Sequence, residues 1–175
     1  IDMAESSGHS NNLQGDLGLA YRNLGKMLWD QGKFDEAIVY YQQAVSDTPT
    51  RTLYRYELAQ LYLIQKRYEE AIRQITLLIQ LEPETASWLG VMANAYLEIG
   101  DLTLAEQFFQ KAIQNGDVKN DFERCWYARA WYGLSIVYNL KGYWESSMKA
   151  SIQAIEINHG LNPTWEQQLN MHFNE

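Results

Sequence analysis

The sequence predicts an all-α protein, an α-solenoid of four helical hairpins followed by one helix that covers the end of the stack. Three observations predict this class. Similar residues recur every 34 positions, small residues stand wherever the two helices of a hairpin would meet, and glycine follows most of the expected first helices. A fixed period of this length is typical of proteins in which each repeat packs only on its neighbours.

The period is clearest at small residues, which two antiparallel helices need where they approach closely. Three successive copies are spaced by 34 residues, and the fourth follows after 42, so that eight residues are inserted near 120–127. These small positions are Gly25, Ala59, Ala93 and Ser135 on the first helices and Ala37, Ala71, Ala105 and Ser147 on the second.

Glycine and proline predict where the helices end. Gly32, Gly100 and Gly142 stand just past three first helices, where a left-handed cap is needed, and Lys66 occupies this place in the second copy. Pro49 stands where a second helix must stop, since proline has no N–H to continue it, and Pro83 repeats it. The four repeats of 17–159 are therefore expected at about 18–51, 52–85, 86–119 and 120–159.

The two ends of the chain are expected to differ from the repeats. Residues 1–16 are polar and aperiodic, which favours a flexible lead-in over the alternative of a capping helix. Residues 160–175 begin with a helix-start pattern at Pro163 and carry Trp165 and Leu169 on one face, so they are expected to form a capping helix. The first residue is not Met, which suggests a segment of a longer protein.

Composition excludes several functions. With 22 acidic against 14 basic residues the formal net charge is −8, which disfavours nucleic acid as a partner. One cysteine, Cys125, and three scattered histidines give no disulfide, no metal-ligand spacing and no expected cofactor. Neither an apolar stretch of membrane-spanning length nor an export signal is found, so a cytoplasmic location is expected.

The repeat resembles the tetratricopeptide repeat family, whose pattern is Trp-x2-Leu-Gly-x2-Tyr, then Ala-x3-Phe, then Pro. The first copy reads Tyr21-x2-Leu24-Gly25-x2-Leu28, followed by Ala37-x3-Tyr41 and Pro49. Arg55 replaces the aromatic residue in the second copy, and the fourth copy matches least. The resemblance implies a right-handed superhelix without catalytic activity, an adaptor or scaffold that binds a peptide or protein surface in its concave groove.

The groove of such a solenoid is lined by one stripe of the first helices. Amides there can bond a peptide backbone, aromatic rings offer rigid contact, and cations favour acidic groups. The alternative is that these residues only solvate the concave surface. The candidates are Arg22, Lys26, Trp29, Tyr56, Gln60, Leu63, Asn94, Leu97, Arg129, Tyr132, Ile136 and Asn139.

Some members of the family hold the C-terminal carboxylate of chaperones with two Lys, one Arg and two Asn. Glu57, Ser87 and Val91 stand where the amide, the lysine and the arginine of that clamp are expected. A chaperone-tail ligand is therefore disfavoured, while another acidic peptide remains open.

The insertion near 120–127 is expected to add about two turns to the fourth first helix. Phe122 and Trp126 then share a face and form either a second docking surface or a contact with the third hairpin. Cys125 is expected to be inert. Two other functions stay open: a regulatory or targeting domain of a larger enzyme, and a scaffold that associates with itself end to end.

Overall fold

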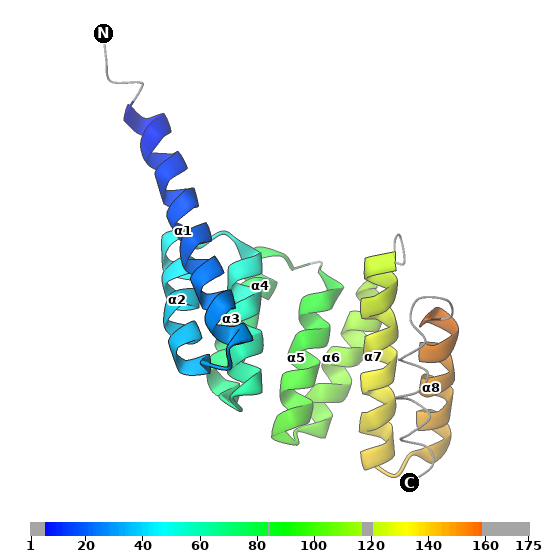
Figure 1. Ribbon diagram of the computed structural model, residues 1–175. Coiled ribbons are helices and arrows are strands. Elements are labelled where there is room, and N and C mark those ends of the chain that lie inside the picture. The colour runs from blue at the N-terminus through cyan, green and yellow to red at the C-terminus, as the bar shows by residue number, and fades with distance from the viewer. Residues whose placement is uncertain (1–5, 84, 117–120, 159–175) are drawn as a thin grey trace. The chain divides into compact units, whose positions relative to one another are not determined.

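The computed structural model describes residues 6–83, 85–116 and 121–158, and the side chains among them from Leu17 onward except at 121 and 122. This part of the chain forms eight α-helices that pack as paired hairpins (Figure 1). The prediction of an all-α hairpin repeat is confirmed. The helices group into two compact units, Ile1–Leu81 and Glu82–Glu175, each of which is described by itself.

Unit 1 contains two hairpins. Helix α1 packs on α2, α3 packs on α4, and α2 also contacts α3, so the second helix of one hairpin lies against the next hairpin. Tyr41, Leu58 and Ile75 are buried at these contacts and form the core of the unit. The helices are α1 (Ser6–Asp30), α2 (Phe34–Asp47), α3 (Thr52–Ile64) and α4 (Tyr68–Leu81).

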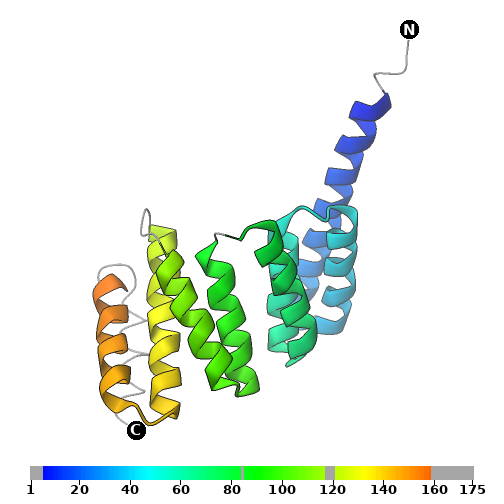
Figure 2. The same cartoon turned by 180° about the vertical axis from the view of Figure 1, so that it is seen from behind.

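Unit 2 repeats this arrangement. Helix α5 packs on α6 and α7 on α8, while α6 and α5 both contact α7 (Figure 2). Leu89, Phe109, Leu134 and Val137 are buried here. The helices are α5 (Ala86–Ile99), α6 (Leu102–Asn115), α7 (Asp121–Leu140) and α8 (Trp144–Asn158).

The small residues lie where the helices of a hairpin approach closely, as predicted. All eight are buried. A Cβ atom added to Gly25 would lie 3.1 Å from the Tyr41 ring, so a larger residue would require the ring to shift by a few tenths of an ångström. In the last hairpin the Ser147 hydroxyl donates a hydrogen bond of 2.9 Å to the Ser135 carbonyl, which satisfies the polar side chain that replaces alanine there.

The predicted left-handed caps are confirmed. Gly32, Gly100 and Gly142 have φ angles of 75°, 89° and 79°, and Lys66 takes the same conformation with φ 56°. This turn lets a backbone N–H past the helix reach a carbonyl five residues back, as in the 2.8 Å bond from the Arg67 N–H to the Tyr62 carbonyl. Lysine bears a steric cost in this conformation that glycine avoids.

The structure differs from the sequence predictions at the start of the chain. Helix α1 begins at Ser6, so the flexible lead-in expected for residues 1–16 is wrong from Ser6 onward. A helix nucleated by the packed part of α1 extends at little cost, because each added residue gains a backbone hydrogen bond without a new nucleus. These first turns extend beyond α2 (Figure 1).

Helix α7 has 20 residues, whereas α3 has 13 and α5 has 14. The inserted residues therefore lengthen the N-terminal part of α7. The capping helix expected at 160–175 lies outside the described residues, and the superhelical path of the four hairpins stays a prediction.

Candidate binding faces on the first helices

The twelve candidate residues divide between the two units. We call Arg22, Lys26, Trp29, Tyr56, Gln60 and Leu63 the unit 1 face, and Asn94, Leu97, Arg129, Tyr132, Ile136 and Asn139 the unit 2 face. The unit 1 face lies on α1 and α3 and the unit 2 face on α5 and α7. Helices α5 and α7 are in direct contact, so the two halves of the unit 2 face lie on neighbouring helices.

In the unit 1 face, Arg22 is paired with Glu57 across α1 and α3. The Arg22 Nε–H donates a 2.8 Å hydrogen bond to Glu57 Oε2, and Nη2 donates a second one to Oε1. The side chains are only 22% and 14% exposed, so water screens the pair weakly. The hydrogen bond to Glu57 raises the pKa of Arg22. The charge that was expected to attract an acidic ligand is therefore balanced within the protein.

Other groups of the unit 1 face also bond within it. The Gln60 amide donates a 2.6 Å hydrogen bond to the Tyr56 hydroxyl one helical turn away. The Trp29 ring meets the buried Tyr41 ring edge to face, with centroids 6.1 Å apart. Lys26 is different, because its side chain is 57% exposed and its ammonium lies 4.0 Å from Asp30. Gln60 and Tyr56 thus bond within α3, and Trp29 packs α1 on α2.

The unit 2 face combines amides with apolar and aromatic side chains. Asn94, Leu97, Tyr132 and Ile136 are half-buried, and Asn139 is exposed. Burial raises the pKa of the Tyr132 hydroxyl above its ordinary value. These side chains are held by helices packed on both sides, since α5 lies against α6 and α7 against α8. The face offers fixed hydrogen-bonding groups beside apolar surface.

The structure joins two regions that the sequence treated separately. The Arg129 guanidinium lies 5.0 Å from the centre of the Trp126 ring, one turn earlier on α7, in a cation–π contact. Trp126 is half-buried, and the side chain of Phe122 lies outside the described residues. Trp126 is therefore an extension of the unit 2 face, and a docking role for it stays a prediction. Cys125 is a free, half-buried thiol.

Sequence reasoning missed the partners of several charged groups. Besides the Arg22–Glu57 pair, the Lys141 ammonium bonds Glu106 at 2.5 Å. In both pairs the partners stand 35 positions apart, one more than the repeat period. Opposite charges 35 residues apart are a sequence signal that could have identified both ion pairs.

Arg55, which replaces the family's aromatic residue, is held by two hydrogen bonds. One, of 2.9 Å, goes to the Gln74 side chain on α4, and the other, of 3.2 Å, goes to the Pro49 carbonyl. Burial lowers the pKa of Arg55. The guanidinium thus joins the hairpin by hydrogen bonds where an aromatic ring would join it by packing.

Among residues 6–83, 85–116 and 121–158, no three His, Cys, Asp or Glu side chains are grouped so that they could hold a metal ion. The same part of the chain contains no helix of the length and apolarity that crossing a bilayer requires.

Comparison with known proteins supports the repeat. Models of the tetratricopeptide repeat match residues 28–95 and 89–115. The chain is 21% identical over 153 residues to the general transcriptional corepressor trfA of Dictyostelium discoideum, covering 83% of this chain and 11% of the relative. It is 25% identical over 105 residues to stress-induced-phosphoprotein 1 of Caenorhabditis elegans, covering 56% and 33%. The chain thus spans a third or less of these relatives.

Solved structures show the same fold. The crystal structure of MamA protein superposes with a TM-score of 0.68 at 24% identity, covering 84% of this chain and 76% of that one. The first tetratricopeptide repeat domain of Spaghetti (RPAP3), bound to the HSP90 peptide SRMEEVD, superposes with a TM-score of 0.60 at 20% identity, covering 73% and 95%.

Stacked helical hairpins with small residues at each crossing define a helical-repeat protein. The chain belongs to the tetratricopeptide repeat family. Domains of this family typically mediate protein–protein interactions and are generally without catalytic activity.

Proposed function

We propose that the chain is a non-catalytic interaction module, an adaptor or scaffold domain, and that the unit 2 face binds an extended peptide of another protein. The observation that supports this is the direct contact of α5 with α7, because α5 carries Asn94 and Leu97 and α7 carries Tyr132 and Ile136. An extended peptide leaves many backbone groups unpaired, and an amide side chain can donate to one and accept from another. Leu97 and Ile136 offer apolar contact next to it.

A strongly acidic chaperone tail suits this chain poorly, although the Spaghetti domain binds such a peptide. The Glu57 carboxylate, on α3, already occupies the Arg22 guanidinium of the unit 1 face and would repel a second carboxylate. Val91 is buried in unit 2 at a position where the chaperone clamp needs a cation. Lys26 and Arg129 are exposed, but they already lie near Asp30 and the Trp126 ring, so we expect a peptide that is largely neutral and partly apolar.

Selection from a library of random peptides displayed on phage tests this proposal. The affinity of the selected peptide is then measured for the parent and for Asn94→Ala and Tyr132→Ala. Each variant is expected to bind about tenfold more weakly, because a lost hydrogen bond or packed ring costs about 1.4 kcal/mol. Gln107→Ala, an exposed residue on the second helix α6, is the matched control and should bind like the parent. Parent-like affinity of both face variants, with their helical circular dichroism intact, would rule out this face.

A further inference from the structure

Gly90 is a glycine that the fold itself does not require. Of the other glycines whose surroundings the structure describes, three have positive φ angles, and at four an added Cβ would lie 3.1 Å or less from another atom. Gly90 has neither property. Apart from its chain neighbours and the nearby backbone of α5, no atom lies within 4 Å of a Cβ added there. The first group is Gly32, Gly100 and Gly142, and the second is Gly18, Gly25, Gly116 and Gly133.

A glycine inside a helix lowers the stability of that helix relative to alanine, because it loses more backbone freedom on folding. Gly90 lies inside α5, and the space around it would accept the methyl group of alanine. No contact within the protein therefore offsets this cost. Glycine is also used where a ligand approaches a backbone closely, and Gly90 fits this second use.

The open space at Gly90 forms a recess. Gly90 is buried, so neighbouring groups shield its backbone from water although no side chain fills the space above it. The equivalent positions of the other three repeats carry long side chains, which are Arg22, Tyr56 and Tyr132. We call the space above the Gly90 Cα atom the Gly90 recess. It is the place of a side chain that this repeat lacks.

The Gly90 recess adjoins the unit 2 face. Asn94 follows Gly90 by four residues on α5, and residues at this spacing lie on the same side of a helix. Four residues of helix rise about 6 Å. Two residues of an extended peptide span about 7 Å, and their side chains point to the same side. A peptide whose backbone bonds the Asn94 amide can therefore direct a side chain into the recess.

The chemistry around the recess selects the occupant. The residues three and four positions from Gly90 on α5 are all uncharged, so a charged side chain would lose water there without gaining a counter-charge from α5. An apolar side chain loses nothing by leaving water and gains contact with the floor of the recess. The four residues are Ala86, Ser87, Ala93 and Asn94.

We propose that the Gly90 recess binds one apolar side chain of the peptide partner, and that Gly90 determines this specificity by leaving the recess empty. The inference rests on the proposed function and names the class of peptide that the unit 2 face selects. One apolar anchor in a desolvated recess, with hydrogen bonds to the backbone beside it, is a common way to bind an extended peptide.

Thermal unfolding of the free protein tests whether the recess is open. Gly90→Ala should raise the Tm, because the methyl group meets no other side chain and alanine favours the helix. A lower Tm for Gly90→Ala would show that the space is already filled, and it would overturn the proposal without any ligand.

A double-mutant cycle with the peptide selected from the phage library tests the occupant. Replacing one apolar residue of that peptide by alanine should weaken its binding to the parent by about tenfold or more. Gly90→Leu fills the recess and should weaken the original peptide by a similar factor, but it should bind the alanine-substituted peptide about as well as the parent does. Gln107→Leu adds the same side chain on an exposed part of α6 and should bind both peptides like the parent.

The proposed function and this inference fail in different ways. A selected peptide that is insensitive to both Asn94→Ala and Tyr132→Ala would contradict the proposed function, and the inference would fall with it. A peptide that is weakened by these variants but binds Gly90→Leu, folded by circular dichroism, like the parent would overturn the inference alone. A peptide in which alanine weakens binding only at charged residues would overturn the apolar occupant.

Discussion

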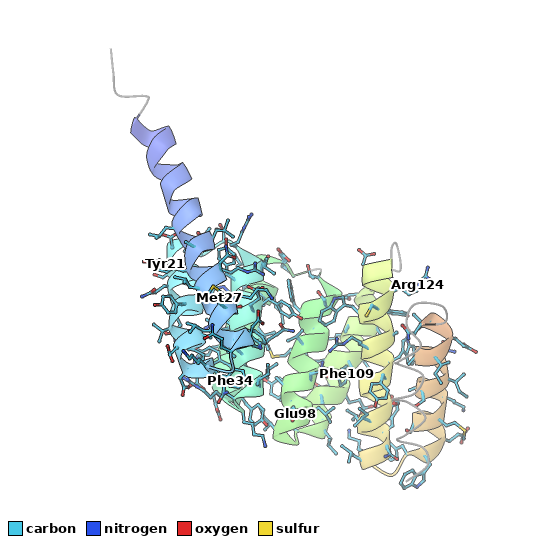
Figure 3. The ribbon with its side chains drawn as sticks, viewed as in Figure 1. Tyr21, Met27, Phe34, Glu98, Phe109 and Arg124 are labelled. Atoms are coloured by element: carbon cyan, nitrogen blue, oxygen red, sulfur yellow. The ribbon has the colours of Figure 1, made fainter. Side chains whose placement is uncertain are left out.

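The crossing of α6 and α7 gives the sharpest stability prediction, for the change Gly133→Ala. A Cβ atom at Gly133 would lie 2.1 Å from Cζ and 2.3 Å from Cε1 of Phe109. Phe109 lies on α6 and is labelled in Figure 3. Because it is fully buried in unit 2, its ring cannot turn into solvent. Such overpacking costs about 3 kcal/mol, the upper end of the usual range. Alanine returns about 1 kcal/mol through its helix propensity. The free energy of unfolding should therefore fall by about 2 kcal/mol.

Gly90→Ala is the matched control in the same unit. Apart from its chain neighbours and the nearby backbone of α5, no atom lies within 4 Å of a Cβ added there, so only the gain in helix propensity remains, about 1 kcal/mol. Thermal unfolding followed by circular dichroism should show a Tm about 4–8 °C lower for Gly133→Ala and about 2–4 °C higher for Gly90→Ala. A Gly133→Ala protein that melts at or above the parent would refute the close approach of α7 to the Phe109 ring.

Three further predictions concern charged and titrating groups. In urea titrations, Arg22→Gln and Glu57→Gln should each lower the free energy of unfolding by about 1 kcal/mol. The double variant should lose less than the sum of the two single losses, and additive losses would contradict a coupled pair. Lys141→Gln removes the partner of Glu106, so adding 1 M NaCl should change the free energy of unfolding less than in the parent. An equal salt effect in the two proteins would argue against that ion pair. Burial raises the pKa of Tyr41 in the folded state, whereas in the unfolded chain the tyrosine ionises near its ordinary pKa of about 10. The protein therefore loses stability as the pH rises above about 10. Tyr41→Phe should reduce the fall in the urea midpoint between pH 8 and pH 11, and equal falls would contradict this.

Much of the fold was predictable because the determining residues are local and periodic. Ala37 and its equivalents are small where helices cross, and Gly32, Gly100 and Gly142 allow the left-handed caps that the structure contains. Helix α1 was the exception, since the polar composition of 1–16 gives no sign that a packed helix would extend to Ser6.

The site was less predictable, because its chemistry depends on contacts between helices. Arg22 stands on the expected stripe, but only the packing of α1 beside α3 brings Glu57 within reach of it. The contact of Arg129 with Trp126 is different, since a spacing of three residues on one helix could have indicated it. The residue types of the stripe therefore suggested a more cationic face than the structure provides.

The most direct test of the central claim is an NMR titration of the isotope-labelled protein, whose mass of 20.4 kDa suits the method, with a selected peptide. The side-chain amide signals of Asn94 and Asn139 report on the unit 2 face. Our account predicts that these signals and the backbone amides of α5 and α7 shift most, while those of α6 and α8 shift least. Largest shifts on α6 or α8, with Asn94 unchanged, would contradict it.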